Sequence, residues 1–207
     1  MSSIGACESK NEIQLPVPIG WYSVARGHEL GKGEVQRVYA FDRELALFRT
    51  REGNAVVLDA YCPHLGAHMG VEGSVVGESL RCPFHGWRFG SDGQCVEISY
   101  CEDIPERASV RAWPVSETNG DIMVWFHPQG AEPTFEVPAL SELDSDEWTD
   151  AQYWERTIPN HVQNIAENVC DPVHFQYVHK MQETPPSEVT IADDDRVLTL
   201  TTDARTA

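Results

Sequence analysis

Two short stretches decide the fold of this chain, Cys62-Pro63-His64 and Cys82-Pro83-Phe84-His85, which together give the pattern C-x-H-x17-C-x2-H. Each stretch supplies one thiolate and one imidazole. This donor set suits a binuclear iron–sulfur cluster in which two cysteines bind one iron and two histidines bind the other. Gly66, Gly70 and Gly86 predict tight loops whose backbone N–H groups point at the cluster sulfurs. A structural zinc ion is the alternative, but zinc modules usually pair like ligands, as C-x2-4-C followed by H-x3-5-H.

Residues beside the two loops indicate which kind of iron–sulfur centre they form. Respiratory-type Rieske proteins join their ligand loops with a disulfide, and here Ala67 and Phe84 hold the positions of those two cysteines. Trp87 stands where the respiratory type has a serine whose hydroxyl bonds to a cluster sulfur, and we expect its indole to shield the cluster beside His85. Fewer hydrogen bonds to the sulfurs stabilise the reduced cluster less and lower its potential. The pattern therefore favours the ferredoxin and oxygenase branch of Rieske proteins.

Composition and charge exclude several classes of function. The chain of 207 residues is long enough for one large domain or two small ones, and its hydrophobic content of 41% is ordinary for a globular protein. The net charge of −18 argues against binding nucleic acids or anionic membranes, because both require a basic surface. No signal peptide opens the sequence and no run approaches about 18 apolar residues, so we expect no membrane span.

The cysteines outside the two loops predict a reducing compartment, which we interpret as the cytoplasm. They are irregularly spaced and suggest no disulfide framework. These residues are Cys7, Cys95, Cys101 and Cys170.

Short β-type runs separated by turn signals fill the first part of the chain and predict a mainly β fold. The clearest runs are Gly20–Ala25, Arg37–Phe41, Leu45–Arg49 and Ala55–Asp59. We expect an antiparallel β-sandwich over residues 20–128, with the two ligand loops projecting from one end. Residues 1–19 are expected to form an N-terminal arm. A linker rich in proline and acidic residues, with one short helix after Ser141, is expected over 129–150.

The remaining part of the chain predicts a few short elements. Tyr153–Ile158 reads as a strand. Apolar residues recur at i, i+3, i+4 and i+7 from Val162 and predict an amphipathic helix over 161–169, with Asn160 as its N-cap. Two further apolar runs around the acidic turn Asp193–Asp195 predict a hairpin, with strands at Val189–Ile191 and Val197–Leu200.

A second pair of histidines, His174 and His179, follows the predicted helix. Residues five apart lie about 140° apart around an ideal helix, so a break is needed to bring both imidazoles onto one ion. Pro172 predicts such a break, and Asp171 lies three residues before the first histidine. An H-x4-H spacing alone is more often a packing or surface feature. Next to an electron-transfer module, however, two histidines and a carboxylate indicate the facial triad of non-haem Fe(II) oxygenases.

The chain resembles the N-terminal portion of Rieske non-haem iron oxygenase α-subunits, and most of all the steroid-acting group of 3-ketosteroid 9α-hydroxylases and cholesterol 7-desaturases. The resemblance covers residues 21–180. It is carried by the stretches Asp59–Ala67, Cys82–Trp87, Ile104–Glu106, Val124–His127 and Asp171–Lys180. It implies that the Rieske-type sandwich is followed, over 151–207, by the beginning of an α+β (helix-grip) catalytic domain that is incomplete.

The resemblance implies the ligands of a [2Fe–2S] cluster. Cys62 and Cys82 would bind one iron, and His64 and His85 would bind the other through neutral imidazoles. Electrons would reach this cluster from a separate ferredoxin or ferredoxin reductase.

The resemblance also implies a mononuclear Fe(II) held by His174 and His179. Asp171 would bridge, by hydrogen bonds, a cluster histidine of a neighbouring subunit to a histidine of this iron, which implies a homotrimer. The activity would be O2-dependent hydroxylation or desaturation, of the mono- or dioxygenase type. The substrate would be apolar, either a polycyclic compound such as a steroid or an aromatic compound. Iron and O2 would supply the chemistry, and the protein the spacing, the electrons and an apolar pocket.

The sequence departs from the family at the third iron ligand, a carboxylate that in the family lies far downstream of the second histidine. We do not expect Asp193, Asp194, Asp195 or Asp203 to replace it, because acidic residues between strand-like runs usually form a solvated turn. The domain is therefore expected to be truncated or completed by another polypeptide. Two alternatives remain, a Rieske-type electron-transfer ferredoxin with a non-catalytic C-terminal tail and a zinc-stabilised binding module. The second histidine pair distinguishes the oxygenase, because a ferredoxin does not need it.

Overall fold

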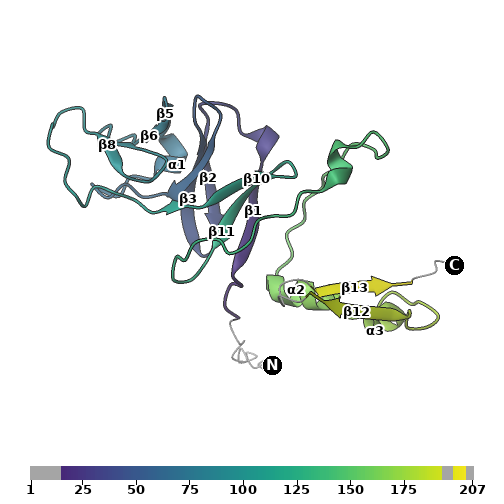
Figure 1. The fold of residues 1–207 in the computed structure, drawn as a ribbon. Coiled ribbons are helices and arrows are strands. Elements are labelled where there is room, and N and C mark those ends of the chain that lie inside the picture. Colours follow the sequence, from purple (N-terminus) through teal and green to yellow (C-terminus); the bar gives the residue numbers. More distant parts are fainter. Residues whose placement is uncertain (1–14, 193–197, 204–207) are drawn as a thin grey trace, which may run out of the picture. The chain divides into compact units, whose positions relative to one another are not determined.

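The computed structural model describes residues 15–192 and 198–203 of the chain (Figure 1). These residues belong to two compact units, one spanning Pro18–Tyr153 and the other built from Trp154 onward together with residues up to Val17. Cys7, the acidic turn Asp193–Asp195 and Val197 lie outside the described residues, so the predictions made for them stay predictions.

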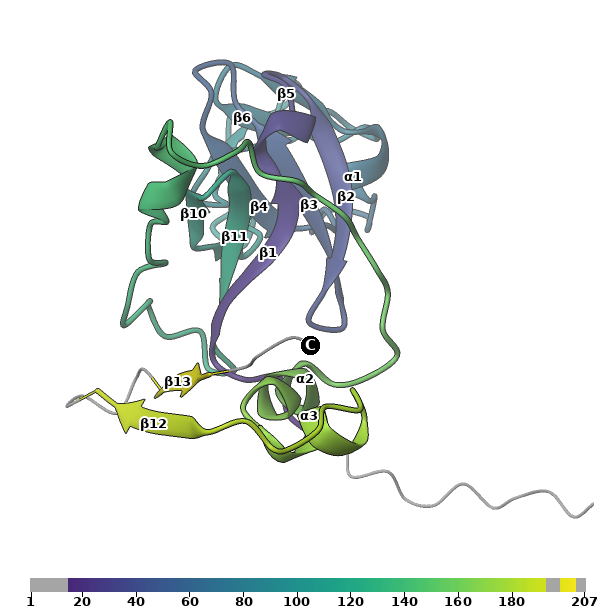
Figure 2. The same cartoon turned by 90° about the vertical axis from the view of Figure 1, so that its right-hand side faces the viewer.

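The first unit consists of three antiparallel sheets (Figures 1 and 2), so the mainly β, antiparallel fold predicted from the sequence is confirmed. One sheet has the order β1 (Gly20–Arg26), β11 (Asp121–Phe126) and β10 (Val115–Thr118). A second has the order β2 (Val35–Ala40), β3 (Arg43–Arg49), β4 (Ala55–Asp59) and β9 (Ala112–Trp113). The third has the order β5 (Ser74–Val76), β6 (Ser79–Arg81), β7 (Arg88–Phe89) and β8 (Cys95–Glu97). Two short helices, η1 (Gly27–Glu29) and α1 (Met69–Glu72), complete this unit before residue 127.

Strand β3 lies between two hydrophobic cores, which explains why four consecutive apolar residues are fully buried in it. Side chains alternate between the two faces of a strand. Leu45 and Leu47 face one core, with Ile122 of β11, while Ala46 and Phe48 face the other. The second core also contains both cysteines of the ligand loops, so the loops rest directly on the main hydrophobic packing of the unit.

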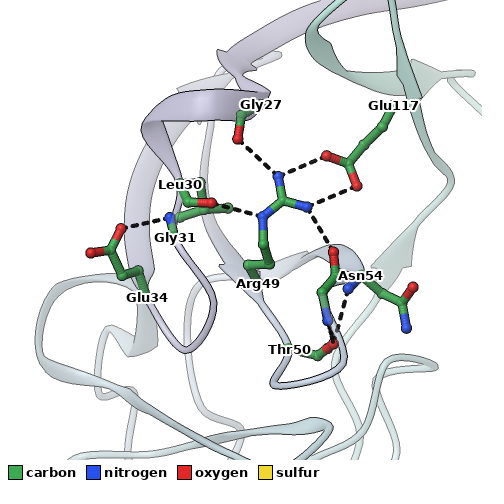
Figure 3. A network of polar contacts seen from close by, with 9 residues as sticks. Gly27, Leu30, Gly31, Glu34, Arg49, Thr50, Asn54 and Glu117 are labelled. Carbon is green, nitrogen blue, oxygen red and sulfur yellow. Dashed lines mark hydrogen bonds and ion pairs between the residues drawn. The ribbon is translucent and has the colours of Figure 1, made fainter.

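Strand β3 is also anchored at its end by the guanidinium group of Arg49 (Figure 3). Its side chain is only 12% exposed and donates hydrogen bonds to the carbonyl oxygens of Gly27, Leu30 and Gly53. It also pairs with both carboxylate oxygens of Glu117 in β10, at 2.7 and 2.9 Å. One buried cation therefore ties together the η1 loop, the β3–β4 turn and a strand of another sheet.

The segment predicted as a linker packs against the sheet formed by β1, β11 and β10. The indole N–H of Trp21 donates to the Phe135 carbonyl and that of Trp125 donates to the Ala131 carbonyl, both at 2.8 Å. The Trp125 and Phe135 rings meet edge to face, 5.1 Å apart. The predicted short helix is a single 3-10 turn, η2 (Ser141–Asp144). Tyr153, which follows this segment, lies under the guanidinium of Arg26.

The second unit contains α2 (Val162–Val169), α3 (Val173–Tyr177) and the antiparallel pair β12 (Ser187–Ile191) and β13 (Leu198–Thr202). The predicted helix and hairpin are therefore confirmed. No residue of these four elements is buried, and the apolar face of α2 is open, with Ile165 38% exposed. The described residues contain no helix with the length and apolar character needed to cross a membrane.

Two predictions in this region are wrong. Tyr153–Ile158 is irregular rather than a strand, because a strand needs a partner edge and the described residues offer none beside it. The N-cap of α2 is His161 rather than Asn160, since the His161 Nδ1 accepts the Gln163 backbone N–H at 3.2 Å. Asn160 instead accepts the backbone N–H of His161 and the side-chain amide of Asn164.

Candidate metal centres

The two ligand loops have the same backbone structure. In the first loop, the Cys62 N–H donates to the Ala67 carbonyl and the Gly66 N–H donates back to the Cys62 carbonyl, both at 2.9 Å. In the second loop, the Cys82 N–H donates to the Trp87 carbonyl at 2.8 Å and the Gly86 N–H donates back to the Cys82 carbonyl at 3.2 Å. The offsets of five and four residues are identical in the two loops. Two equal turns therefore present one thiol and one imidazole each.

Glycine makes these turns possible. Gly66 has φ 73° and Gly86 has φ 72°, in the left-handed region that other residues rarely adopt. This outcome agrees with the tight loops expected from the sequence. Gly70 has an ordinary conformation but a close approach, since a Cβ there would lie 3.2 Å from the Leu45 carbonyl oxygen.

The four predicted cluster ligands converge from the two loops. The imidazoles of His64 and His85 have ring centroids 4.7 Å apart, and both cysteines are buried. Burial is the largest of the effects that raise the pKa of the Cys62 thiol to about 11. The neighbouring Cys82 thiol acts in the same direction, and a backbone hydrogen bond from His64 opposes it. A backbone donor at a ligand sulfur is what stabilises a thiolate–iron bond.

An unpaired nitrogen supports a metal cluster at this position. The Nδ1 atom of His64 is buried without a hydrogen-bond partner among the described residues. A buried polar atom normally has a partner, and a metal bond supplies one. The two buried thiols, the backbone donor and this nitrogen fit a cluster with two sulfur and two nitrogen ligands.

The donor set of each loop bears on the zinc alternative. Zinc modules usually pair like ligands, whereas each loop here supplies one thiol and one imidazole.

The two histidines have different surroundings. The Trp87 indole stacks on the His64 ring, with centroids 4.7 Å apart and planes 5° apart. Its Nε1–H donates to the Tyr100 hydroxyl at 2.7 Å. His85, by contrast, is exposed, and the Phe84 ring lies edge-on to it with a centroid separation of 6.1 Å. The sequence predicted that Trp87 shields the centre, and the ring that the indole covers is that of His64. The sequence gave no signal for Tyr100.

A network of charged side chains lies next to the first ligand loop, at the start of α1. His68, at the N-cap of α1, accepts the Gly70 N–H on Nδ1 and directs Nε2 at Glu44, 3.3 Å away. Glu44 also pairs with Arg37. Hydrogen bonds from Arg37 and His68 lower the pKa of the Glu44 carboxyl to about 2. His68 therefore uses both ring nitrogens to hold the start of α1 and Glu44.

The second histidine pair is brought together by the end of a helix. Helix α3 stops at Tyr177 and Lys180 adopts φ 60°, so the chain reverses after the helix. As a result the rings of His174 and His179 lie 5.2 Å apart, despite a spacing that would separate them on a continuous helix. His174 Nδ1 contacts the Asp171 carbonyl oxygen, which leaves Nε2 as the nitrogen available to a metal ion. The break that brings the two rings together therefore lies after Tyr177 and not, as the sequence predicted, at Pro172, because Pro172 precedes both histidines and caps the start of α3.

The second site is incomplete within the described chain. Two imidazoles are present, but no third Asp, Glu, His or Cys in the described residues joins them. Asp171 uses one carboxylate oxygen to accept the Val173 N–H at 2.9 Å. Asp203 ends the hairpin, where its N–H donates to the Pro186 carbonyl. Residues 15–192 and 198–203 thus supply two of the three ligands that a facial triad requires.

Comparisons with known families divide the chain in the same way. Residues 20–114 match the Rieske [2Fe-2S] domain, and residues 124–203 match the 3-ketosteroid 9alpha-hydroxylase C-terminal domain. The chain is 42% identical over 171 residues to cholesterol 7-desaturase nvd of Xenopus laevis, covering 82% of this chain and 38% of that protein. It is 39% identical over 164 residues to the probable oxygenase component of 3-ketosteroid-9-alpha-monooxygenase of Rhodococcus rhodochrous, covering 77% of this chain and 41% of that protein.

A solved structure shows the same architecture. The crystal structure of dicamba monooxygenase bound to dicamba aligns with a TM-score of 0.60 and 28% identity, over 84% of this chain and 53% of that one. The chain therefore spans less than half the length of the curated relatives described above and about half of this structure.

Proposed function

The chain belongs to the Rieske non-haem iron oxygenase family, and on that premise we propose that it carries the electron-accepting part of an oxygenase and two ligands of its catalytic iron. The observation that carries the proposal is the pair of identical loops, with buried thiols and a buried, unpaired His64 Nδ1 between them. The oxygenase activity is proposed for the whole protein, because this chain spans less than half the length of the curated relatives described above.

The cluster ligands are Cys62 and Cys82 on one iron and His64 and His85 on the other. When bound, the cluster stores and passes single electrons. The protein contributes burial of the thiols, the backbone donor at Cys62 and the indole that covers His64. Together these groups keep water away from one side of the site and leave His85 accessible.

His174 and His179 hold the mononuclear iron, with the third ligand supplied by the rest of the catalytic domain. Bound iron supplies the means to activate O2. The Asp171 carbonyl oxygen orients His174, and the free carboxylate oxygen of Asp171 receives a hydrogen bond from a cluster histidine of a neighbouring subunit in a homotrimer. Exposed His85 suits that contact better than His64, which is covered.

The substrate, partners and location form the outer part of the proposal. Relatives that share 39–42% identity are named as acting on cholesterol or on a 3-ketosteroid. We assign an apolar polycyclic, steroid-like substrate, hydroxylated or desaturated with O2, and a ferredoxin or ferredoxin reductase as electron donor. The cytoplasmic location stays a prediction from cysteine usage and composition.

One observation favours a second candidate, the electron-transfer ferredoxin. The described residues complete the cluster site but place only two histidines at the second site. A ferredoxin would need nothing more than the first site. The paired histidines His174 and His179 and the adjacent Asp171 favour the oxygenase, because their convergence serves no electron-transfer role.

Metal analysis of anaerobically purified chain separates these functions. About three irons per chain support the oxygenase and about two support the ferredoxin. Zinc in a colourless protein contradicts both. His174→Ala should remove only the mononuclear iron and leave the EPR signal of the reduced cluster intact. Loss of that signal in His174→Ala would show that the two sites are wrongly partitioned.

A further inference from the structure

A continuous line of aromatic rings crosses the cluster end of the first unit. It runs from Tyr100 through Trp87, His64 and His85 to Phe84. The contacts are the 2.7 Å hydrogen bond between the Trp87 indole and the Tyr100 hydroxyl, and ring centroid separations of 4.7, 4.7 and 6.1 Å along the rest of the line. The two proposed imidazole ligands lie in the middle, and both ends of the line are exposed.

The two ends of this line differ in chemistry. At the Phe84 end, His85 is itself exposed and is able to donate a hydrogen bond to a carboxylate. At the Tyr100 end, the face of His64 is covered by a parallel indole, so no external group reaches that face of the ligand directly. Any electron that arrives from this side must cross Trp87. Tyr100, whose side chain is 61% exposed, forms the outer surface.

We propose that the Tyr100–Trp87 end is the docking surface for the electron donor, and that electrons enter the cluster there and leave from the His85 end. This inference rests on the cluster ligation proposed above and adds a direction to it. Tyr100 makes the contact with the donor, and Trp87 is a positioning residue that closes the gap between Tyr100 and His64.

Charge around Tyr100 indicates what kind of donor fits. The segment that follows it carries the exposed acidic residues Glu102, Asp103 and Glu106, against one exposed Arg107. A turn closed by the Cys101 N–H and the Ile98 carbonyl, at 3.0 Å, presents this segment beside Tyr100. An acidic rim around an exposed aromatic ring is complementary to a protein with basic side chains around its redox group. The donor is therefore a flavin or iron–sulfur reductase component with a basic face.

The step itself is a single electron transfer. The reduced donor loses one electron and the cluster gains it, with no covalent bond formed or broken and no proton moved. Because electron transfer slows steeply with distance, a hydrogen-bonded and stacked path from Tyr100 to His64 carries the electron faster than a gap filled with water. Trp87 and Tyr100 are not oxidised in this step.

The test uses the full chain with its cluster and a reductase containing flavin and a [2Fe–2S] cluster, selected beforehand because it reduces the unmodified chain. Calorimetry measures the Kd of the reductase, and anaerobic stopped-flow absorbance measures single-turnover reduction of the cluster. Three variants are compared, namely Tyr100→Ala, Tyr100→Phe and the triple variant Glu102→Gln, Asp103→Asn, Glu106→Gln. Tyr61→Ala is the matched control, because Tyr61 is also exposed and near the cluster but packs edge-on against His68 rather than His64.

We expect Tyr100→Ala to raise the Kd of the reductase by about tenfold or more, as loss of a central interface aromatic does. Tyr100→Phe keeps the ring but removes the acceptor of the indole N–H, so it should slow reduction within the complex more than it raises the Kd. The triple variant should reduce the dependence of the association rate on ionic strength. In all of them the EPR signal and midpoint potential of the cluster should match the unmodified chain, and Tyr61→Ala should leave both the Kd and the rate unchanged.

Three outcomes would overturn the inference. The first is an unchanged Kd and reduction rate in Tyr100→Ala, and the second is an equal effect of Tyr61→Ala. The third is a larger effect of Phe84→Ala than of Tyr100→Ala, which would place the donor at the opposite end. If the unmodified chain itself shows no cluster EPR signal, the proposed function fails and this inference fails with it.

Discussion

Both units of this chain bring two imidazoles together, but only the first adds buried thiols and a hydrophobic core beneath them. In the first unit, sheets from distant parts of the sequence enclose two hydrophobic cores and hold two loops against one of them. In the second unit, α2, α3 and the β12–β13 hairpin bury no residue, and the paired histidines come from a single stretch of chain. The described residues of the first unit supply both candidate ligands and the hydrophobic packing that holds them. Those of the second unit supply two imidazoles on elements that bury no residue.

The largest expected effect is loss of the cluster from the first unit alone. Cys82→Ser replaces a thiolate ligand by a hydroxyl that does not ionise near neutral pH, so the chain should contain no assembled cluster. EPR of the reduced protein and analysis of acid-labile sulfide measure this. Cys170→Ser, at an exposed cysteine of the second unit, is the control and should retain the full signal. An intact cluster in Cys82→Ser would remove that residue from the ligand set.

Core truncation tests the difference in packing. Phe48→Ala empties a fully buried site in β3 and should lower the free energy of unfolding by about 3–5 kcal/mol. Ile165→Ala, on the open face of α2, should cost less than about 1 kcal/mol. Urea titration of the iron-free chain, followed by tryptophan fluorescence, gives both values. Equal losses would mean that the face of α2 is covered in solution.

The third prediction concerns the buried cation in Figure 3. Arg49→Ala leaves three carbonyl oxygens and the Glu117 carboxylate without their donor, and should lower the free energy of unfolding by about 2–3 kcal/mol. Arg37→Ala removes an exposed cation that pairs with Glu44, and should cost about 1 kcal/mol or less. The same urea titration serves for both variants. If Arg37→Ala lowers the free energy of unfolding as much as Arg49→Ala does, burial of the guanidinium does not determine the size of the loss.

The smallest expected effect is a loss of folding stability at acid pH, which comes from Glu44 next to the first ligand loop. The pKa of Glu44 is lowered from 4.5 to about 2, chiefly by the hydrogen bond from Arg37. A carboxyl with a lowered pKa stabilises the folded state above its ordinary pKa and loses that contribution as the pH falls. The stability of the iron-free chain should therefore decrease between about pH 4.5 and pH 2, and Glu44→Gln should make this decrease shallower. Glu142→Gln, at an exposed position of η2, is the control and should follow the unmodified chain.

Local patterns predicted what depends on neighbours along the chain. The positive φ of Gly66 and Gly86, the alternating strands and the helix from Val162 follow from residue type and spacing. The break that brings His174 and His179 together lies after Tyr177 rather than at Pro172, where the sequence placed it. The strand predicted for Tyr153–Ile158 failed because a strand depends on a partner, and the N-cap moved by one residue because either Asn160 or His161 is able to accept the first free N–H. The predicted linker is held by Trp21 and Trp125, two side chains far from it in sequence.

The sequence by itself determined the types of candidate ligand, their grouping into two mixed loops and the family. These features depend only on which residues are present and on their spacing along the chain. The tertiary structure alone decided which histidine is covered, since the plane of Trp87 depends on its hydrogen bond to Tyr100, thirteen residues away.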